Sequence, residues 1–216
     1  MRKELFVANE YYHIYNRGVD KRKIFLDERD RIRFIHTFYI LNNFLEIPPH
    51  FDFINLEPKE LLQTRKEPFI TIAAGCLMTT HFHFLLSPTR DENISKFFHK
   101  MGVSYTKYFN KRRERSGSLF ESTFKARCVN THEYAAYLSQ YIHLNPLDLF
   151  RASNEKELWQ KVKEYQWSTL PDYLGKKSKL SILLNDSFRH DVLDMDNHEY
   201  EKFLFELYQE QKSSQI

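Results

Sequence analysis

Hydrophobic residues follow two different periods along this chain, and each period predicts one kind of element. Short apolar or aromatic runs predict strands. The strands are expected at residues 11–16, 69–77, 82–86 and 124–129. Apolar residues that recur every three or four positions predict helices, with Asp27 and Thr131 placed to start two of them. The helices are expected at residues 28–44, 94–111 and 133–144.

The order of these elements predicts the fold class. Along the chain they read β-α-β-β-α-β-α, which is typical of an α+β sandwich of the ferredoxin-like or RRM-like type. Its sheet is expected to be antiparallel, with helices packed on one face. Residues 50–68 are polar and predict a loop, whereas residues 186–212 predict a separate acidic helix. We therefore expect one domain over residues 1–176 and an acidic helical tail over residues 177–216.

Charge is distributed unevenly along the chain, although the net charge is only +3. Residues 95–127 contain nine Lys and Arg against two Asp and Glu, a local charge of +7. Residues 185–216 contain three Lys and Arg against eight Asp and Glu, a local charge of −5. A basic middle and an acidic end fit a polyanion-binding face, but they equally fit a solvated helix with a neutralising tail.

Other features of the composition narrow the class of protein. Aromatic residues make up 16% of the chain, enough to build a core and also to stack on unpaired bases. Cys76 and Cys128 form neither a disulfide framework nor a metal motif, and buried free thiols are expected. The start of the chain lacks the apolar core of a signal peptide, and the longest apolar run is too short for a bilayer. We expect a cytoplasmic protein that does not contact membranes.

The segment His81-Phe82-His83 is the first candidate for chemistry. Residues i and i+2 of a strand point to the same face, so both imidazoles project together. Two adjacent imidazoles are suited to holding one divalent metal ion. In a chain with ten histidines such a pair also arises by chance, so the motif alone leaves a structural role open.

Tyr141 and Asn145 are the second candidate pair. They stand four residues apart on a predicted helix and therefore share a face. An amide oxygen is a suitable third ligand for Mg²⁺, and a phenol beside a metal-bound phosphate is a plausible nucleophile. The alternatives are a core aromatic for Tyr141 and a C-terminal helix cap for Asn145. The rival nucleophiles are Tyr105, Tyr108 and Tyr137.

Several motifs in order resemble one known family. They are YHIYNRG, CLMTTHFHFLL, SYTKYFNKRRERSGSLFESTFKA, YLSQYIHLNP and YQWSTLPDYLG. Over roughly residues 8–175 the chain resembles the single-tyrosine HUH transposases of the smallest insertion sequences, and most closely their REP-associated relatives, the RAYTs. The resemblance implies an HUH endonuclease core in which His81, His83 and Asn145 hold Mg²⁺ or Mn²⁺ and Tyr141 is the nucleophile.

The resemblance also implies an activity and partners. Such enzymes cleave and rejoin single-stranded DNA through a 5′-phosphotyrosine, at hairpin-flanked sites in DNA transposition and recombination. The residues expected to contact the DNA are basic: Arg17, Lys107, Lys111, Arg112, Arg113, Arg115, Lys125 and Arg127. The family includes homodimers and monomers, so both states stay open. So do a catalytically silent or domesticated hairpin-binding protein, a metal hydrolase that uses water, and an RNA-binding protein of similar fold.

Overall fold

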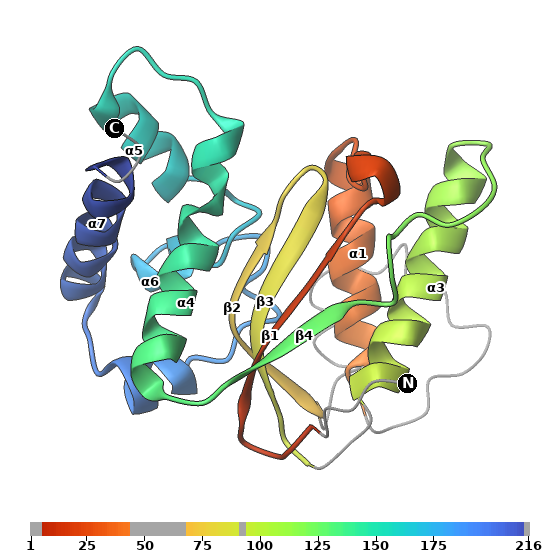
Figure 1. Ribbon diagram of the computed structural model, residues 1–216, viewed down its shortest axis with the longest axis horizontal. Coiled ribbons are helices and arrows are strands. Elements are labelled where there is room, and N and C mark those ends of the chain that lie inside the picture. The colour runs from red at the N-terminus through yellow and green to blue at the C-terminus, as the bar shows by residue number, and fades with distance from the viewer. Residues whose placement is uncertain (1–5, 44–67, 91–93, 214–216) are drawn as a thin grey trace.

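A four-stranded antiparallel sheet organises the protein in the computed structural model, which describes residues 6–43, 68–90 and 94–213 (Figure 1). The strand order is β2-β3-β1-β4, so the first strand in the sequence lies inside the sheet. The strands are β1 (Tyr11–Arg17), β2 (Ile70–Leu77), β3 (His81–Pro88) and β4 (Lys125–Val129). The four predicted strands and the α+β class are confirmed, with bounds that move by one or two residues.

Helices surround the sheet in the positions that the apolar periods predict. The long ones are α1 (Glu28–Leu41), α3 (Ile94–Arg112), α4 (His132–Leu144) and α7 (Asn197–Ser213). The shorter helical segments are η1 (Val19–Lys21), η2 (Asn145–Leu149), α5 (Glu155–Lys163), α6 (Leu170–Tyr173) and η3 (Arg189–Leu193). The side chain of Asp27 caps α1 by accepting from the Asp30 N–H, and Thr131 caps α4 in the same way from the Tyr134 N–H.

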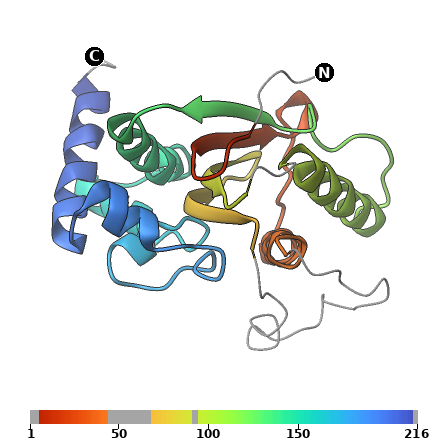
Figure 2. The same cartoon turned by 90° about the horizontal axis from the view of Figure 1, so that it is seen from below.

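Helices lie on both faces of the sheet, which corrects the expectation that they pack on one face. Figure 2 places α1 and α3 on one side of the strands and α4 with α7 on the other. The reason is visible in β3, where Phe82 and Phe84 belong to the core under α1 and α3, and Leu85 belongs to the core under α4. Both faces of the central strands are therefore apolar enough to bury a helix.

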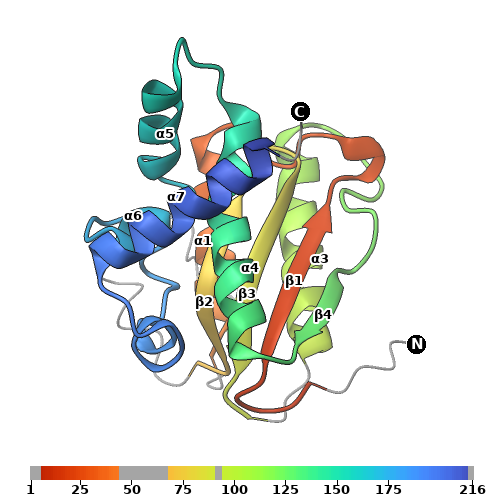
Figure 3. The same ribbon diagram turned by 60° about the vertical axis from the view of Figure 1, so that its left-hand side comes forward.

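The C-terminal segment packs on α4 rather than standing apart, as Figure 3 shows for α7. Tyr200 and Leu204 are fully buried in the same core as Ile142 of α4. The helix itself was predicted, but its apolar stripe fits the outer side of α4, so the prediction of a separate helix is wrong.

Two further predictions concern the loop after the first helix and the absence of a membrane-spanning segment. Most of the predicted loop at residues 50–68 lies outside the described residues, as does the predicted last residue of the first helix, Phe44. Within the described part of the chain, no helix has the length and apolar character needed to cross a membrane.

Candidate active site

The sheet face under α4 carries a group of polar and aromatic side chains. In the β1–β3 register Arg17 lies opposite His81 and Tyr15 lies opposite His83. In the β1–β4 register Tyr15 lies opposite Lys125 and His13 opposite Arg127. Because directly opposed residues and residues two apart point to the same side, these side chains form a polar patch on the sheet face toward α4, next to the apolar residues such as Leu85 that pack on that helix.

The two predicted metal-ligand histidines lie side by side on this surface. The ring centroids of His81 and His83 are 5.1 Å apart and the rings are nearly perpendicular. Nδ1 of His81 is 2.9 Å from the Thr80 hydroxyl oxygen, and Nδ1 of His83 is 2.8 Å from Nε2 of His13. In each ring Nδ1 is therefore bonded to a neighbour, and Nε2 is the nitrogen that can face a ligand.

Tyr141 approaches the histidines from α4. Its ring centroid is 5.9 Å from that of His83 and 6.4 Å from that of His13, and the side chain is 38% exposed, so that a substrate can reach it. Burial and the charge of Asp148 raise the pKa of the Tyr141 phenol, while Arg17 acts in the opposite direction. The phenol is thus protonated at neutral pH and needs help to act as a nucleophile.

Asn145 links Tyr141 to His81. Its amide nitrogen donates to the Tyr141 backbone carbonyl over 2.8 Å. Burial lowers the pKa of His81, and a hydrogen bond with the Asn145 side chain opposes that effect. Since the amide N–H is directed to Tyr141, the amide oxygen is the group that faces His81. The structure thus brings together all four residues predicted for the chemistry.

These residues fit the metal ion that the resemblance implies. Burial holds the pKa of His83 well below its usual range and also lowers that of His81, which favours the neutral rings that a cation requires. An amide oxygen of Asn145 would add a hard donor to the two ring nitrogens. Among the residues that the structure describes, no three His, Cys, Asp or Glu side chains form a metal-binding group, so the remaining ligands would be water or phosphate oxygens.

The predicted DNA-contacting residues divide between the two faces. Arg17, Lys125 and Arg127 lie on the Tyr141 face. Lys125 is 5.9 Å from the Tyr15 ring centroid and 3.8 Å from a Glu121 carboxylate oxygen. Because these three side chains flank the histidines, they can hold a phosphate chain beside Tyr141.

The other predicted contacts are on α3 or just after it, behind the sheet. Arg112 and Arg113 form ion pairs of 2.6 to 3.0 Å with Asp27 and the fully buried Asp30. Their charges are thus used to tie the end of α3 to the start of α1. That they bind DNA stays a prediction.

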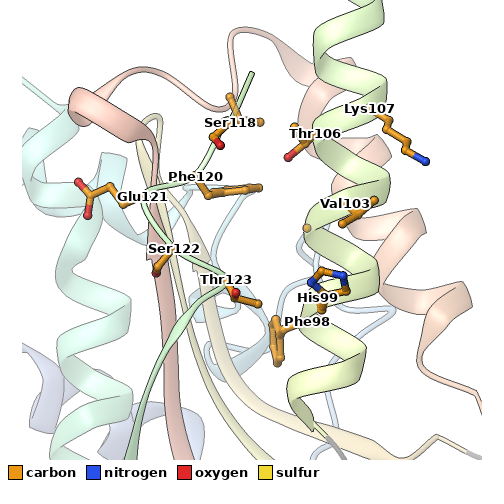
Figure 4. Close-up of a pocket in the computed structure, with 12 residues that line it drawn as sticks. Phe98, His99, Val103, Thr106, Lys107, Ser118, Phe120, Glu121, Ser122 and Thr123 are labelled. Carbon is orange, nitrogen blue, oxygen red and sulfur yellow. The ribbon is translucent and has the colours of Figure 1, made fainter. Parts of the chain in front are cut away.

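The three remaining basic residues, Arg115, Lys111 and Lys107, lie near the end of α3 or along it. Arg115 donates to the Ser118 carbonyl and bonds to Asn110, which braces the turn after α3. Lys111 is exposed. Lys107 lies at a groove of about 380 Å³ between α3 and residues 118–123, where Phe120 faces the helix (Figure 4).

The rival tyrosines are placed differently from Tyr141. Tyr105 is fully buried and its hydroxyl donates to the Ile24 carbonyl, so it belongs to the core. The Tyr108 hydroxyl donates to Asp30. Tyr137 is 45% exposed on α4, and its ring stacks on Tyr134 instead of reaching the histidines. The geometry favours Tyr141 among the candidates.

Sequence reasoning missed three residues at the site: His13, Tyr15 and Asp148. Tyr15 stacks on His83 with centroids 5.6 Å apart. Asp148 lines a second hollow, of about 360 Å³, together with Tyr141, Asn145 and Lys212 of α7. The alternation in YHIYNRG could have shown that His13, Tyr15 and Arg17 share a face, but the pairing of β1 with β3 could not be read from it.

Comparison with known proteins agrees with this geometry. Residues 54–145, which contain His81, His83, Tyr141 and Asn145, match the family described as "Transposase IS200 like". No curated protein matches the chain. A solved structure described as "Structure of the REP associates tyrosine transposase bound to a REP hairpin" has a similar fold. Its TM-score is 0.52 at 11% identity, over 81% of this chain and 85% of that one. Over residues 54–145 the chain is thus similar in sequence to the IS200-like transposases, and over most of its length it has the fold of the solved REP-associated structure.

Proposed function

We propose that this protein is a DNA transposase that cleaves and rejoins single-stranded DNA with Tyr141 as its nucleophile. The observation that carries the proposal is the position of Tyr141, whose ring lies 5.9 Å from His83 while Asn145 joins the same helix to His81. A nucleophile, two imidazoles and an amide thus converge on one surface, flanked by Arg17, Lys125 and Arg127.

The reaction is an exchange of phosphodiester bonds. The Tyr141 oxygen attacks the phosphorus of the scissile phosphate as its proton is lost to solvent or a nearby base. The bond from phosphorus to the 3′-oxygen breaks, and that oxygen takes up a proton to become a free 3′-hydroxyl. A second 3′-hydroxyl then attacks the 5′-phosphotyrosine, joins new ends and releases Tyr141, so that no external energy source is consumed.

The protein's contribution to this exchange is positioning and charge. His81, His83 and Asn145 are the residues that would hold Mg²⁺ or Mn²⁺, and such an ion polarises phosphoryl oxygens and stabilises the charge that develops on them. Arg17 lowers the pKa of Tyr141 against the effect of burial, which favours ionisation of the phenol. Lys125 and Arg127 would contact flanking phosphates.

The DNA substrate is proposed to carry a hairpin. The support is the solved relative of similar fold, which is described as bound to a REP hairpin. Because His83 and Tyr141 meet within one chain, a monomer has a complete set of these residues, and a homodimer is not required for the chemistry. The competing proposal is a silent protein that binds the same hairpin without cutting it.

Covalent trapping tests the proposal. The protein is incubated with 5′- or 3′-labelled single strands from the flanks of its own gene, with Mg²⁺ or Mn²⁺, and resolved on a denaturing gel. We expect a protein–DNA adduct that carries only the label 3′ of the cut, and that disappears with a chelator or in Tyr141→Phe. Tyr137→Phe is the matched control, because it alters an exposed tyrosine on the same helix, and it should keep the adduct.

Each other outcome has a definite meaning. An adduct that persists in Tyr141→Phe contradicts Tyr141 as the nucleophile. Cleavage without an adduct favours a hydrolase that uses water. Hairpin binding by the wild type without cleavage of any flanking strand favours the silent binding protein.

A further inference from the structure

His13 is a buried histidine that the proposed reaction does not use. It lies on β1, two residues before Tyr15, which pairs with His83, and both histidines are 8% exposed. Its Nε2 is 2.8 Å from Nδ1 of His83, and the two rings stack with centroids 5.1 Å apart at 22°. A side-chain bond between two buried imidazoles fixes both rings in position.

We propose that His13 is a positioning residue that holds His83 in the tautomer with hydrogen on Nδ1 and directs Nε2 of His83 toward Tyr141 and Asn145. The use of that Nε2 as a metal ligand rests on the proposed function. The tautomer and the ring orientation do not, because they are properties of the bond between the two histidines.

Of the two nitrogens of a neutral imidazole, one carries hydrogen and the other a lone pair. If Nδ1 of His83 donates to Nε2 of His13, the lone pair of His83 is on Nε2. If His13 donates instead, Nε2 of His83 carries the hydrogen and cannot bind a cation. The direction of this one bond therefore decides whether His83 is competent as a ligand.

His81 has an equivalent arrangement. The Thr80 hydroxyl lies 2.9 Å from its Nδ1, and this hydroxyl can accept the Nδ1 hydrogen. Each histidine of the HxH pair thus has an Nδ1 partner, but only the partner of His83 is itself buried and ring-stacked. His13 is not a third ligand in this geometry, because its Nε2 is occupied by the bond to His83 and the described residues contain no three-histidine metal group.

The first measurement is the tautomer of His83 in the metal-free protein, read from long-range ¹H–¹⁵N NMR spectra of ¹⁵N-histidine-labelled samples at fixed neutral pH. We expect hydrogen on Nδ1 in the wild type. His13→Phe keeps an aromatic ring but removes the nitrogen, so His83 should lose this preference. His13→Gln, which keeps a side-chain acceptor, should restore much of it.

The second measurement is Mn²⁺ affinity, by calorimetry without DNA. Loss of an outer hydrogen-bond partner of a metal-ligating histidine typically weakens binding by about 10- to 100-fold. We expect such a loss in His13→Phe and partial recovery in His13→Gln. His99→Phe is the matched control, since His99 is exposed on α3 behind the sheet, and it should leave tautomer and affinity unchanged.

The outcomes separate this proposal from the proposed function. Hydrogen on Nε2 of His83 in the wild type, or an unchanged tautomer in a folded His13→Phe, overturns the role of His13. If His83 has hydrogen on Nδ1 in the wild type and loses this preference in His13→Phe, but the wild type binds no Mn²⁺, the role of His13 is supported and the metal-dependent mechanism is contradicted. If His13→Phe fails to fold, the tautomer of His83 in the wild type and in His13→Gln still tests the role of His13.

Discussion

At the scale of single residues, Asn145 joins the two halves of the site. Its N–H group bonds to the Tyr141 carbonyl and its oxygen faces His81, so one side chain couples the position of α4 to the histidine pair. Asn145 is only partly buried, which means that its hydrogen bonds compete with water and contribute little to folding. Its geometry is therefore better explained by function than by stability.

Replacing Asn145 separates these two effects. Asn145→Leu keeps the size of the side chain but removes both the amide oxygen and the N–H group. We expect Mn²⁺ affinity and the rate of adduct formation each to fall by about tenfold or more, comparable to the loss of a partner in a metal site. The free energy of unfolding should change by no more than about 1 kcal/mol. Unchanged Mn²⁺ affinity in a folded variant would remove Asn145 from the ligand set.

At this scale, local spacing determines which residues of the site can be predicted from the sequence. His81, His83, Tyr141 and Asn145 could be found because each pair depends on a local period, two residues in a strand or four in a helix. His13 could not, because its bond to His83 depends on which strands pair. Arg112 and Arg113 were counted as basic charge for the same reason, since Asp27 and Asp30 lie more than 80 positions away.

At the scale of elements, α4 is held in place by a buried chain of hydrogen bonds. The Tyr200 hydroxyl of α7 bonds to both Ser139 and His143 of α4. His143 also bonds to the Thr169 hydroxyl, which accepts from the Gly75 N–H of β2. The chain therefore runs from α7 through α4 to the sheet. It fixes the helix that carries Tyr141, whose side chain points the other way.

This chain makes stability depend on pH. Burial lowers the pKa of His143 to about 3, whereas an unfolded histidine titrates near 6.5. Below pH 6.5 the unfolded state binds the extra proton, so stability is present above that pH and is lost as pH falls toward 3. The loss from His143 alone is about 1.4 kcal/mol per pH unit.

Urea unfolding of the metal-free protein from pH 7 downward tests this prediction. His143→Gln should be less stable than the wild type at neutral pH, because it leaves buried partners unsatisfied. Its stability should nevertheless fall less steeply with decreasing pH, since one buried neutral histidine has been removed. Parallel curves for the two proteins would contradict the assignment of this pH dependence to His143.

At the scale of the whole molecule, the sheet separates two groups of basic residues. Arg17, Lys125 and Arg127 share the face of Tyr141, and Lys107 and Lys111 lie on α3 behind the sheet. In the sequence, Lys107, Lys111, Lys125 and Arg127 belong to one basic segment, residues 95–127. The fold divides it, and the proposed reaction requires DNA only on the face where α4 and the histidine pair meet.

Salt dependence of binding can distinguish the two faces. Each lost phosphate contact lowers the slope of log affinity against log salt by about 0.7 for a single strand. The double variant Lys125→Gln/Arg127→Gln should therefore weaken single-stranded DNA binding and lower that slope by about 1.4. The matched variant Lys107→Gln/Lys111→Gln removes the same charge behind the sheet and should change the slope much less, as measured by fluorescence anisotropy across a salt series. Equal losses in both variants would mean that the DNA extends around the edge of β4 onto α3, and that the basic segment acts as one surface despite its division by the fold.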